Sequence, residues 1–239
     1  MRVEAALFDV FGTCVDWRSG VAAHVAPLLA ERGVDVVPEH FADLWRAEYQ
    51  PAMARVRAGA RPYTQLDDLH LENLDRVLER LGLGARFETT ARAHLNTAWE
   101  RLPAWPDVAP GLEALRDAGV LVAPCSNGSI GLMARLARFA GLDWDAILGA
   151  DVARTYKPEP AAYLASAASL RLPPERIAFV AAHNDDLAAA QALGFVTAFV
   201  ARPHEHGLSQ TSDLAPSGAW DVVAEDFTGL KPMFAQRPS

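Results

Sequence analysis

The sequence predicts an α/β protein with a doubly wound parallel sheet and a helical insertion after its first strand. Two patterns support this fold class. Short, continuous apolar runs alternate with helical stretches beyond residue 100, whereas residues 17–99 contain helical patterns and almost nothing strand-like. Parallel strands that are covered on both faces are expected to be continuous apolar runs, with helices connecting them.

Five apolar runs are the candidate strands of this sheet. They are continuous rather than alternating, as expected where both faces of a strand are buried. The runs are residues 5–8, 120–125, 146–148, 177–182 and 196–200.

Three helical patterns lie between these runs, at residues 111–118, 130–140 and 186–193. Each is followed by a glycine, which favours a helix end because glycine readily adopts the left-handed conformation found there. The alternation of strand and helix with short turns predicts a doubly wound, Rossmann-like core.

The region between the first two strands is far longer than an ordinary loop. It carries helical stretches at residues 21–32, 40–58 and 66–81. We therefore predict a core of residues 1–16 and 100–239, with a helical cap domain of residues 17–99 inserted into it. Residues 236–239 are expected to be a loose tail.

Composition and charge exclude several classes of function. Of the 239 residues, 51% are hydrophobic and 22% are charged, which is typical of a globular chain. The formal net charge of −8 argues against a nucleic-acid partner, because a phosphate backbone attracts a basic surface. The apolar runs are much shorter than the roughly 20 residues of a membrane span, and the N-terminus lacks a signal-peptide layout. We expect a cytoplasmic protein with no membrane partner.

Ligands of open α/β sheets bind at the carboxyl ends of the strands, so the residues that follow each strand form the candidate site. Asp9 follows the first predicted strand, and Ser126 and Asn127 follow the second in a glycine turn that could cradle an anion. Lys157 follows the third, and Asp186 follows the fourth. Each residue alone has an ordinary interpretation as a turn, a helix cap or a surface group. Together, at successive strand ends, they are a far more specific signal of a functional site than any one of them.

This constellation resembles the haloacid dehalogenase superfamily. Its four motifs correspond to Phe8-Asp9-Val10-Phe11-Gly12-Thr13, Ser126-Asn127, Lys157-Pro158 and Asp185-Asp186. The resemblance covers the whole chain, because the long helical insertion also looks like the cap of that superfamily. Most members are magnesium-dependent phosphatases, so the resemblance implies the fold and leaves the reaction open.

Two departures separate this chain from the phosphatases. Those enzymes carry a general acid two residues after the nucleophile, where this chain has Phe11. They also carry a metal-binding acid in the fourth motif, where this chain has Ala182 before His183. Phosphoryl transfer depends on both groups. The resemblance therefore implies an enzyme without a metal or other cofactor.

The remaining features are similar to those of the type II 2-haloacid dehalogenases. That branch has an aromatic residue at the place of Phe11 and a Trp-Arg pair in the cap, here Trp45-Arg46. Its second and third motifs match Ser126-Asn127-Gly128-Ser129 and Tyr156-Lys157-Pro158, with Tyr163 six residues after the lysine. Residues 202–207 and 220–227 also look like members of this branch.

The resemblance implies a role for each site residue. Asp9 would be the nucleophile that displaces halide and forms an ester, and Lys157 would keep Asp9 ionised. Arg46 would receive the halide. Asp186, held by Lys157, would activate or place the water that hydrolyses the ester. Substrate contacts are expected from Phe11, Thr13, Ser126, Asn127 and Tyr163.

Some details of the site stay open. His183 stands where many relatives have Asn, and it could orient the hydrolytic water, contact the substrate carboxylate or fill the site. Asp185 takes a place often held by Trp, so one wall of the halide pocket would come from elsewhere. The insertion offers further arginines as alternatives to Arg46, namely Arg55, Arg57 and Arg61.

The other reactive side chains have ordinary interpretations. Cys14 and Cys125 give no disulfide framework and are expected to be buried packing groups. His204 and His206 are expected in a surface turn, because no third metal ligand stands at a suitable spacing.

The sequence thus predicts a hydrolase that converts short 2-haloalkanoates to 2-hydroxy acids. Candidate substrates are haloacetates, fluoroacetate among them, and 2-halopropionates. The expected partners are the halocarboxylate, the halide product and a second copy of the chain in a homodimer. Three alternatives remain: a phosphatase with a degraded metal site, a non-catalytic interaction protein, and an enzyme that uses Asp9 on another activated carbon electrophile.

Overall fold

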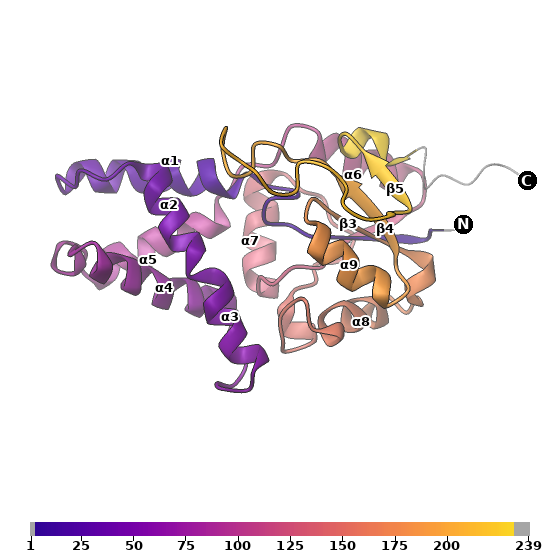
Figure 1. Cartoon of the computed structure of the whole chain (residues 1–239), viewed down its shortest axis with the longest axis horizontal. Helices are drawn as coiled ribbons and strands as arrows, with labels where there is room; N and C mark the ends of the chain where they lie inside the picture. The colour runs from indigo at the N-terminus through magenta and orange to yellow at the C-terminus, as the bar shows by residue number, and fades with distance from the viewer. Residues whose placement is uncertain (1–2, 232–239) are drawn as a thin grey trace, which may run out of the picture.

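A five-stranded sheet, parallel throughout, forms the centre of the computed structural model, which describes residues 3–231 (Figure 1). The strand order is β2-β1-β3-β4-β5. The strands are β1 Ala5–Phe8, β2 Leu121–Pro124, β3 Ile177–Ala181, β4 Val196–Val200 and β5 Val222–Ala224. The predicted loose tail, residues 236–239, lies outside the described residues.

Helices cover both faces of this sheet. On one face, Ala6 and Phe8 of β1 join a buried cluster with side chains of α6 (Val108–Asp117) and α7 (Ile130–Ala140). On the other, Ala5 and Leu7 join a cluster with side chains of α8 (Pro160–Ser169) and α9 (Asn184–Ala192). Successive side chains of a strand point to opposite faces, so one short apolar run is buried on both sides. The predicted doubly wound α/β fold is confirmed.

The helical insertion after the first strand is also confirmed. It comprises α1 Trp17–Glu31, α2 Pro38–Ala47, α3 Tyr49–Arg57, α4 Leu66–Arg80 and α5 Thr89–Asn96, which form a separate group beside the sheet (Figure 1). The stretch predicted as one helix at residues 40–58 is two. Pro51 lacks the N–H that would bond the carbonyl of Ala47, so α2 ends there. The proposed domain boundaries stay a prediction.

One predicted strand, residues 146–148, is wrong. At the edge of β2, the Asp145 N–H donates to the Val122 carbonyl at 2.9 Å, and the Val122 N–H donates to the Asp145 carboxylate at 2.9 Å. A side-chain carboxylate thus takes the place of a strand carbonyl, and the pairing ends after one residue. The sheet instead gains β5 at its opposite edge. Because β5 has three residues and is partly exposed, it lacks the apolar run that marks a buried strand.

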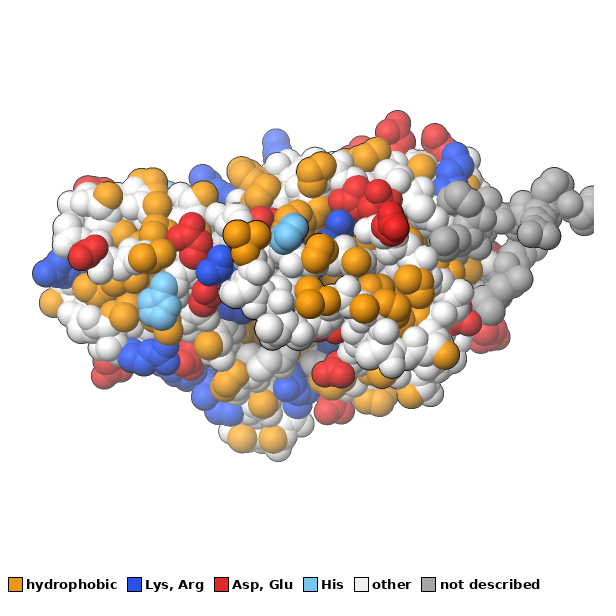
Figure 2. All heavy atoms as spheres, turned by 45° about the horizontal axis from the view of Figure 1, so that its top comes forward, with side chains coloured by type: hydrophobic (Ala, Val, Ile, Leu, Met, Phe, Trp, Pro, Cys, Tyr) orange, Lys and Arg blue, Asp and Glu red, His pale blue; other side chains and the backbone are white. Residues whose placement is uncertain are grey.

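The surface mixes charge and apolar groups. Figure 2 shows acidic, basic and apolar side chains interspersed on one face, with neither sign of charge covering it. Within residues 3–231, the structure contains no helix that is long and apolar enough to cross a membrane.

The buried face of β4 provides a test of the packing. Phe199 is 1% exposed in the cluster beneath α8 and α9, whereas Phe139 on α7 is 55% exposed. We predict that Phe199→Ala lowers the free energy of unfolding by about 3–5 kcal/mol, because it removes buried surface and leaves a cavity. Phe139→Ala, the matched control, should change it by no more than about 0.5 kcal/mol. Urea titration measures both, and equal effects would contradict this packing.

Candidate active site

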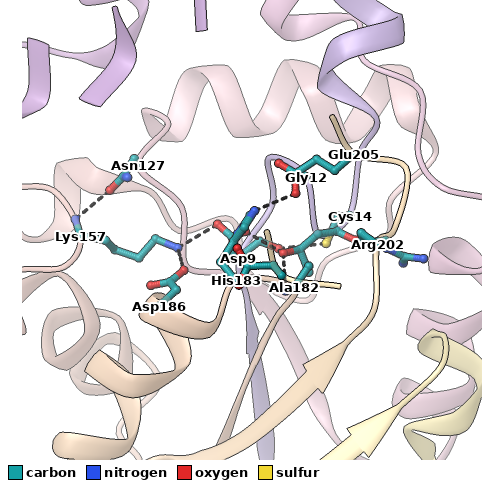
Figure 3. Close-up of polar contacts among 12 residues, drawn as sticks. Asp9, Gly12, Cys14, Asn127, Lys157, Ala182, His183, Asp186, Arg202 and Glu205 are labelled. Atoms are coloured by element: carbon teal, nitrogen blue, oxygen red, sulfur yellow. Dashed lines mark hydrogen bonds and ion pairs between the residues drawn. The ribbon is translucent and has the colours of Figure 1, made fainter. Parts of the chain in front are cut away.

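The predicted site residues converge at one edge of the sheet (Figure 3). Asp9 directly follows β1, Asn127 lies in the turn after β2, and His183 and Asp186 lie at the start of α9, after β3. The carboxyl ends of parallel strands meet at the same edge, which explains why residues so distant in sequence lie close together. Lys157 reaches the site from the loop before α8 and not from a strand end, because the third predicted strand does not form.

Both carboxylate oxygens of Asp9 accept hydrogen bonds. The Lys157 ammonium donates to Oδ1 at 2.8 Å, and the Thr13 hydroxyl donates to Oδ2 at 2.7 Å. His183 Nδ1 lies 3.1 Å from the same Oδ2. Burial alone would raise the pKa of Asp9, but the charges of Lys157 and His183 and their hydrogen bonds hold it well below its usual range. Asp9 is therefore a carboxylate at any pH near neutrality.

Lys157 bridges two buried carboxylates. Its ammonium donates to Asp9 and, through a short contact, to Asp186. The other oxygen of Asp186 accepts from the Tyr163 hydroxyl. Burial would lower the pKa of Lys157, yet the negative charges of Asp186 and Asp9 raise it well above its usual value. Burial raises the pKa of Asp186 despite the nearby ammonium. Lys157 thus supplies a fixed positive charge between the two acids.

His183 lies between Asp9 and a second carboxylate, Glu205. Nε2 of His183 is 2.9 Å from Glu205 Oε2, while Nδ1 faces Asp9. Burial would lower the pKa of His183, but the charge of Glu205 and the contacts with Asp9 raise it well above the usual value. His183 lowers the pKa of Glu205 in return. The geometry favours an imidazolium that donates to a carboxylate on each side.

A cavity of about 760 Å³ opens in front of these groups. Asp9, Lys157, His183 and Asp186 line it. Phe11 of the loop after β1 also lines it, as do Arg46 of α2 and Tyr49 of α3 from the insertion. The lining thus combines charged groups of the core with aromatic groups and one arginine.

Arg46 is the arginine of the insertion that lines this cavity. Its guanidinium lies over the rings of Tyr49, Trp17 and Phe11, with centroid distances of 4.0, 5.2 and 5.8 Å. The alternatives are placed differently. Arg57 donates to the Lys157 carbonyl, Arg61 pairs with Glu72, and Arg55 is not among the lining residues. Aromatic faces hold the Arg46 plane while leaving its N–H groups free to bind an anion.

Three predicted substrate contacts lie behind the cavity and do not line it. Thr13 is fully buried, donates to Asp9 and accepts from the Ala182 N–H at 2.9 Å. Ser126 accepts from the Gly128 N–H at 3.1 Å, and the Tyr163 hydroxyl is bound to Asp186. Thr13 and Tyr163 thus hold carboxylates, and Ser126 holds the turn after β2. Their contact with substrate stays a prediction. Of the predicted contacts, Phe11, Arg46 and Asn127 do line the cavity.

Asn127 joins the core to the insertion. Its amide oxygen accepts from the Lys157 N–H at 2.8 Å, and its amide nitrogen donates to the Tyr49 hydroxyl at 3.1 Å. Asn127 therefore fixes the backbone of Lys157 and one aromatic residue of the cavity wall together.

Glu205 is absent from the predicted site residues. A signal for it exists in the sequence, since it follows β4 at the same edge of the sheet and stands between His204 and His206. The rule that directs attention to strand ends applies to β4 as it does to the first strands.

The donor set does not fit the magnesium ion of the superfamily's phosphatases. The ammonium of Lys157 occupies the space between the Asp9 and Asp186 carboxylates, and Thr13 and His183 take the other oxygen of Asp9. Ala182 contributes no ligand. Within residues 3–231, no three Cys, His, Asp or Glu side chains are grouped in a way that could hold a metal ion. Mg²⁺ prefers oxygen ligands that are free to coordinate it.

The fold and the residues of the site place this chain in a class of hydrolases. A sequence model of the haloacid dehalogenase-like hydrolases matches residues 3–194, and the chain belongs to this family. The resemblance seen in the motifs is thereby confirmed.

Relatives within the family include 2-haloacid dehalogenases. The chain is 30% identical to (S)-2-haloacid dehalogenase 1 of Pseudomonas sp. (strain CBS-3) over 89% of this chain and 95% of that relative. It is similar to the crystal structure of the defluorinating L-2-haloacid dehalogenase Rha0230, with 47% identity, a TM-score of 0.94, and coverage of 97% and 95% of the two chains. It also resembles the L-2-haloacid dehalogenase of Xanthobacter autotrophicus solved with chloropropionic acid covalently bound, with 25% identity, a TM-score of 0.80, and coverage of 97% and 98%.

The pKa values of His183 and His70 are shifted in opposite directions. An unperturbed histidine has a pKa of about 6.5. The pKa of His183 is raised by its two carboxylate neighbours, so His183 should keep both ring protons above neutral pH. The pKa of His70 is lowered well below that value by burial and by Arg46, so His70 should stay neutral in mild acid. Nitrogen-15 NMR of the histidine rings measures both, and a neutral His183 at neutral pH would contradict the assigned charge.

Proposed function

We propose that this chain hydrolyses short 2-haloalkanoates to 2-hydroxy acids through an ester on Asp9. The chain is a hydrolase that acts on carbon–halide bonds. One observation carries the proposal: an ionised Asp9, bound to Lys157, lines the same cavity as Arg46. A negatively charged nucleophile and an anion-binding group on opposite sides of a bound molecule are the arrangement that displacement with inversion requires.

In the first half of the reaction, a carboxylate oxygen of Asp9 attacks the carbon that bears the halogen. The new carbon–oxygen bond forms as the carbon–halogen bond breaks, and the halide leaves with the bonding electrons toward Arg46. The guanidinium offers N–H donors and positive charge to the departing anion. The carboxylate of the substrate is assigned to the backbone N–H groups of the turn after β2. The relative solved with chloropropionic acid covalently bound supports an ester intermediate.

The same geometry disfavours phosphatase activity. Phe11, which cannot transfer a proton, stands where those enzymes carry the acid for the leaving group, and Ala182 stands where they carry a metal-binding acid. Both oxygens of Asp9 are already engaged by Lys157, Thr13 and His183. A magnesium ion on Asp9 would also withdraw charge from the nucleophile. We therefore propose a reaction that uses neither a metal nor another cofactor.

Fluoride is included among the leaving groups that we propose. Carbon–fluorine cleavage needs strong hydrogen-bond donors where the fluoride departs, and Arg46 lines the cavity with a guanidinium held by aromatic rings. A relative at 47% identity is named as a defluorinating enzyme, which supports this extension. The homodimer and a cytoplasmic location stay predictions, and sedimentation tests the former.

Loss of the nucleophile should abolish the activity. We predict that the protein releases halide from chloroacetate, fluoroacetate and 2-chloropropionate in the presence of EDTA, and that Asp9→Asn releases none, because the amide has no charged oxygen to attack carbon. Asp143→Asn is the control, since Asp143 is 90% exposed and does not line the cavity. Halide measurement by ion chromatography tests the prediction. Phosphate-ester hydrolysis on added magnesium, without halide release from any substrate, would contradict the proposed function.

The halide acceptor can be tested separately. Arg46→Met keeps much of the apolar stem and removes the charge, and we predict that it slows halide release by about 100-fold, as expected for the loss of a positioned donor. Arg61→Met, which removes an arginine paired with Glu72, should leave the rate unchanged. The fluoride rate should fall further than the bromide rate, since fluoride depends most on hydrogen bonding. Equal effects of the two substitutions would assign the halide to another group.

A further inference from the structure

Glu205 is a carboxylate that the displacement of halide does not use. It is 1% exposed, and its oxygens contact the ring nitrogens of Trp17 and His183 (Figure 3 shows the His183 contact). Burying a charged carboxylate is costly unless it is paired and hydrogen-bonded. Its placement therefore points to a function at His183.

The surroundings of Glu205 fix its orientation. Trp17 Nε1–H donates to Oε1 at 2.9 Å, which leaves Oε2 for His183. The carboxylate packs against Gly12, where a Cβ would lie 2.1 Å from Oε1. Gly12 has a φ of +90°, a conformation that also favours glycine. The loop after β1 thus carries the nucleophile and makes room for Glu205.

The three groups Asp9, His183 and Glu205 form a continuous chain of contacts. His183 Nδ1 is 3.1 Å from Asp9 Oδ2, and Nε2 is 2.9 Å from Glu205 Oε2. His183 lines the cavity, and its side chain is 24% exposed there. A histidine held by a carboxylate on its far side and open to the reacting group on its near side has the geometry of a general base.

We infer that His183 is the base that activates water for hydrolysis of the Asp9 ester, and that Glu205 is the residue that positions it. The inference rests on the proposed function, because it concerns the second half of that reaction. His183 touches the reacting carboxyl group and is a catalytic residue; Glu205 acts through His183.

Formation of the ester changes the proton affinity of His183. Before the reaction, the imidazolium lies between the negative charges of Asp9 and Glu205. Alkylation of Asp9 removes one of these charges, so Nδ1 releases its proton to bulk water. Glu205 keeps the remaining proton on Nε2, and the lone pair of Nδ1 then faces the ester.

Hydrolysis of the ester consumes one water molecule. Neutral His183 takes one proton from water at Nδ1 while the water oxygen bonds to the Asp9 carboxyl carbon. The tetrahedral intermediate collapses, the ester carbon–oxygen bond to the substrate breaks, and the departing alkoxide takes the second proton of that water. The products are the 2-hydroxy acid, the Asp9 carboxylate and the His183 imidazolium, and the one proton of the overall reaction is the one released on alkylation.

Asp186, which the sequence predicts for this role, is less available. One of its oxygens binds the Lys157 ammonium and the other binds the Tyr163 hydroxyl. A water at the ester would have to compete with these two donors for the oxygens of Asp186. The geometry leaves Asp186 as the partner that holds Lys157 against Asp9.

Other charged groups also act on this pair. His206 Nε2 is 3.7 Å from Glu205 Oε1, and the positive charges of Arg46 and Lys157 face Glu205 and Asp9 respectively. Asp185, Asp186 and Asp213 line the same cavity. The pH dependence of ester hydrolysis therefore reflects the protonation of His183 under the influence of all these charges. Comparison of the native protein with a Glu205 variant shows how much of this dependence comes from Glu205.

The decisive variant is Glu205→Gln. The indole N–H of Trp17 requires an acceptor, so the side-chain oxygen of the substituted residue should take the place of Oε1. Its side-chain nitrogen should then face His183 Nε2. The neutral ring must then carry its proton on Nδ1 and cannot accept one from water there. With 2-chloropropionate we expect a burst of one halide per active site. Halide release after the burst should be at least about 100-fold slower than in the native protein. The Asp9 ester should accumulate and be visible in the mass spectrum of the intact protein. His204→Ala, an exposed histidine beside Glu205, is the control and should behave like the native protein.

A second variant keeps the inference testable if Glu205→Gln does not fold. His183→Ala should also give the halide burst and accumulate ester, and added imidazole should restore hydrolysis, which a structural role would not produce. The native hydrolysis rate should rise with pH as His183 loses its proton, and this dependence should vanish in His183→Ala. Continuous halide release at the native rate by either variant, with no ester, would overturn the inference. Absence of halide release from the native protein would instead overturn the proposed function.

Discussion

The ammonium group of Lys157 between the carboxylates of Asp9 and Asp186 is the interaction on which the site depends. Removal of any one of these three charges would destabilise the site, because an opposite charge beside it would be left without its partner. Lys157 keeps the buried Asp9 ionised, and Asp186 keeps Lys157 in place. The ammonium group thus meets the requirement for a bare, charged oxygen nucleophile.

The fold brings these charges together by its topology. Crossover connections return each strand in the same direction, so Asp9 and the start of α9 emerge at one edge although they are far apart in sequence. The insertion after β1 then closes the opposite side of the cavity. Asn127 connects the two parts by binding the Lys157 backbone and the Tyr49 hydroxyl. The position of the cavity wall is therefore coupled to the position of the ammonium group.

The strand and helix pattern was predictable where elements are long or fully buried, and it failed at the sheet edges. Residues 146–148 are apolar because Leu148 packs against the core, while Asp145 ends the pairing with β2. β5 is too short and too exposed to show a pattern. In the site, residue types indicated the charges, but they could not show that Thr13 and Tyr163 point at carboxylates and away from the cavity. Glu205 was missed because its place after β4 is only a weak signal, and its contact with His183 is seen only in the folded chain.

If Asp9 is the nucleophile, one of its own oxygens passes to the substrate. A single turnover in heavy-oxygen water, with protein in excess over 2-chloropropionate, reveals this transfer by mass spectrometry of the product and of the peptide that contains Asp9. We expect the first 2-hydroxy acid to carry ordinary oxygen from Asp9 and the heavy oxygen to enter the Asp9 carboxylate. Heavy oxygen in the product of that first turnover, with none in Asp9, would mean direct attack by water and would exclude Asp9 as the nucleophile.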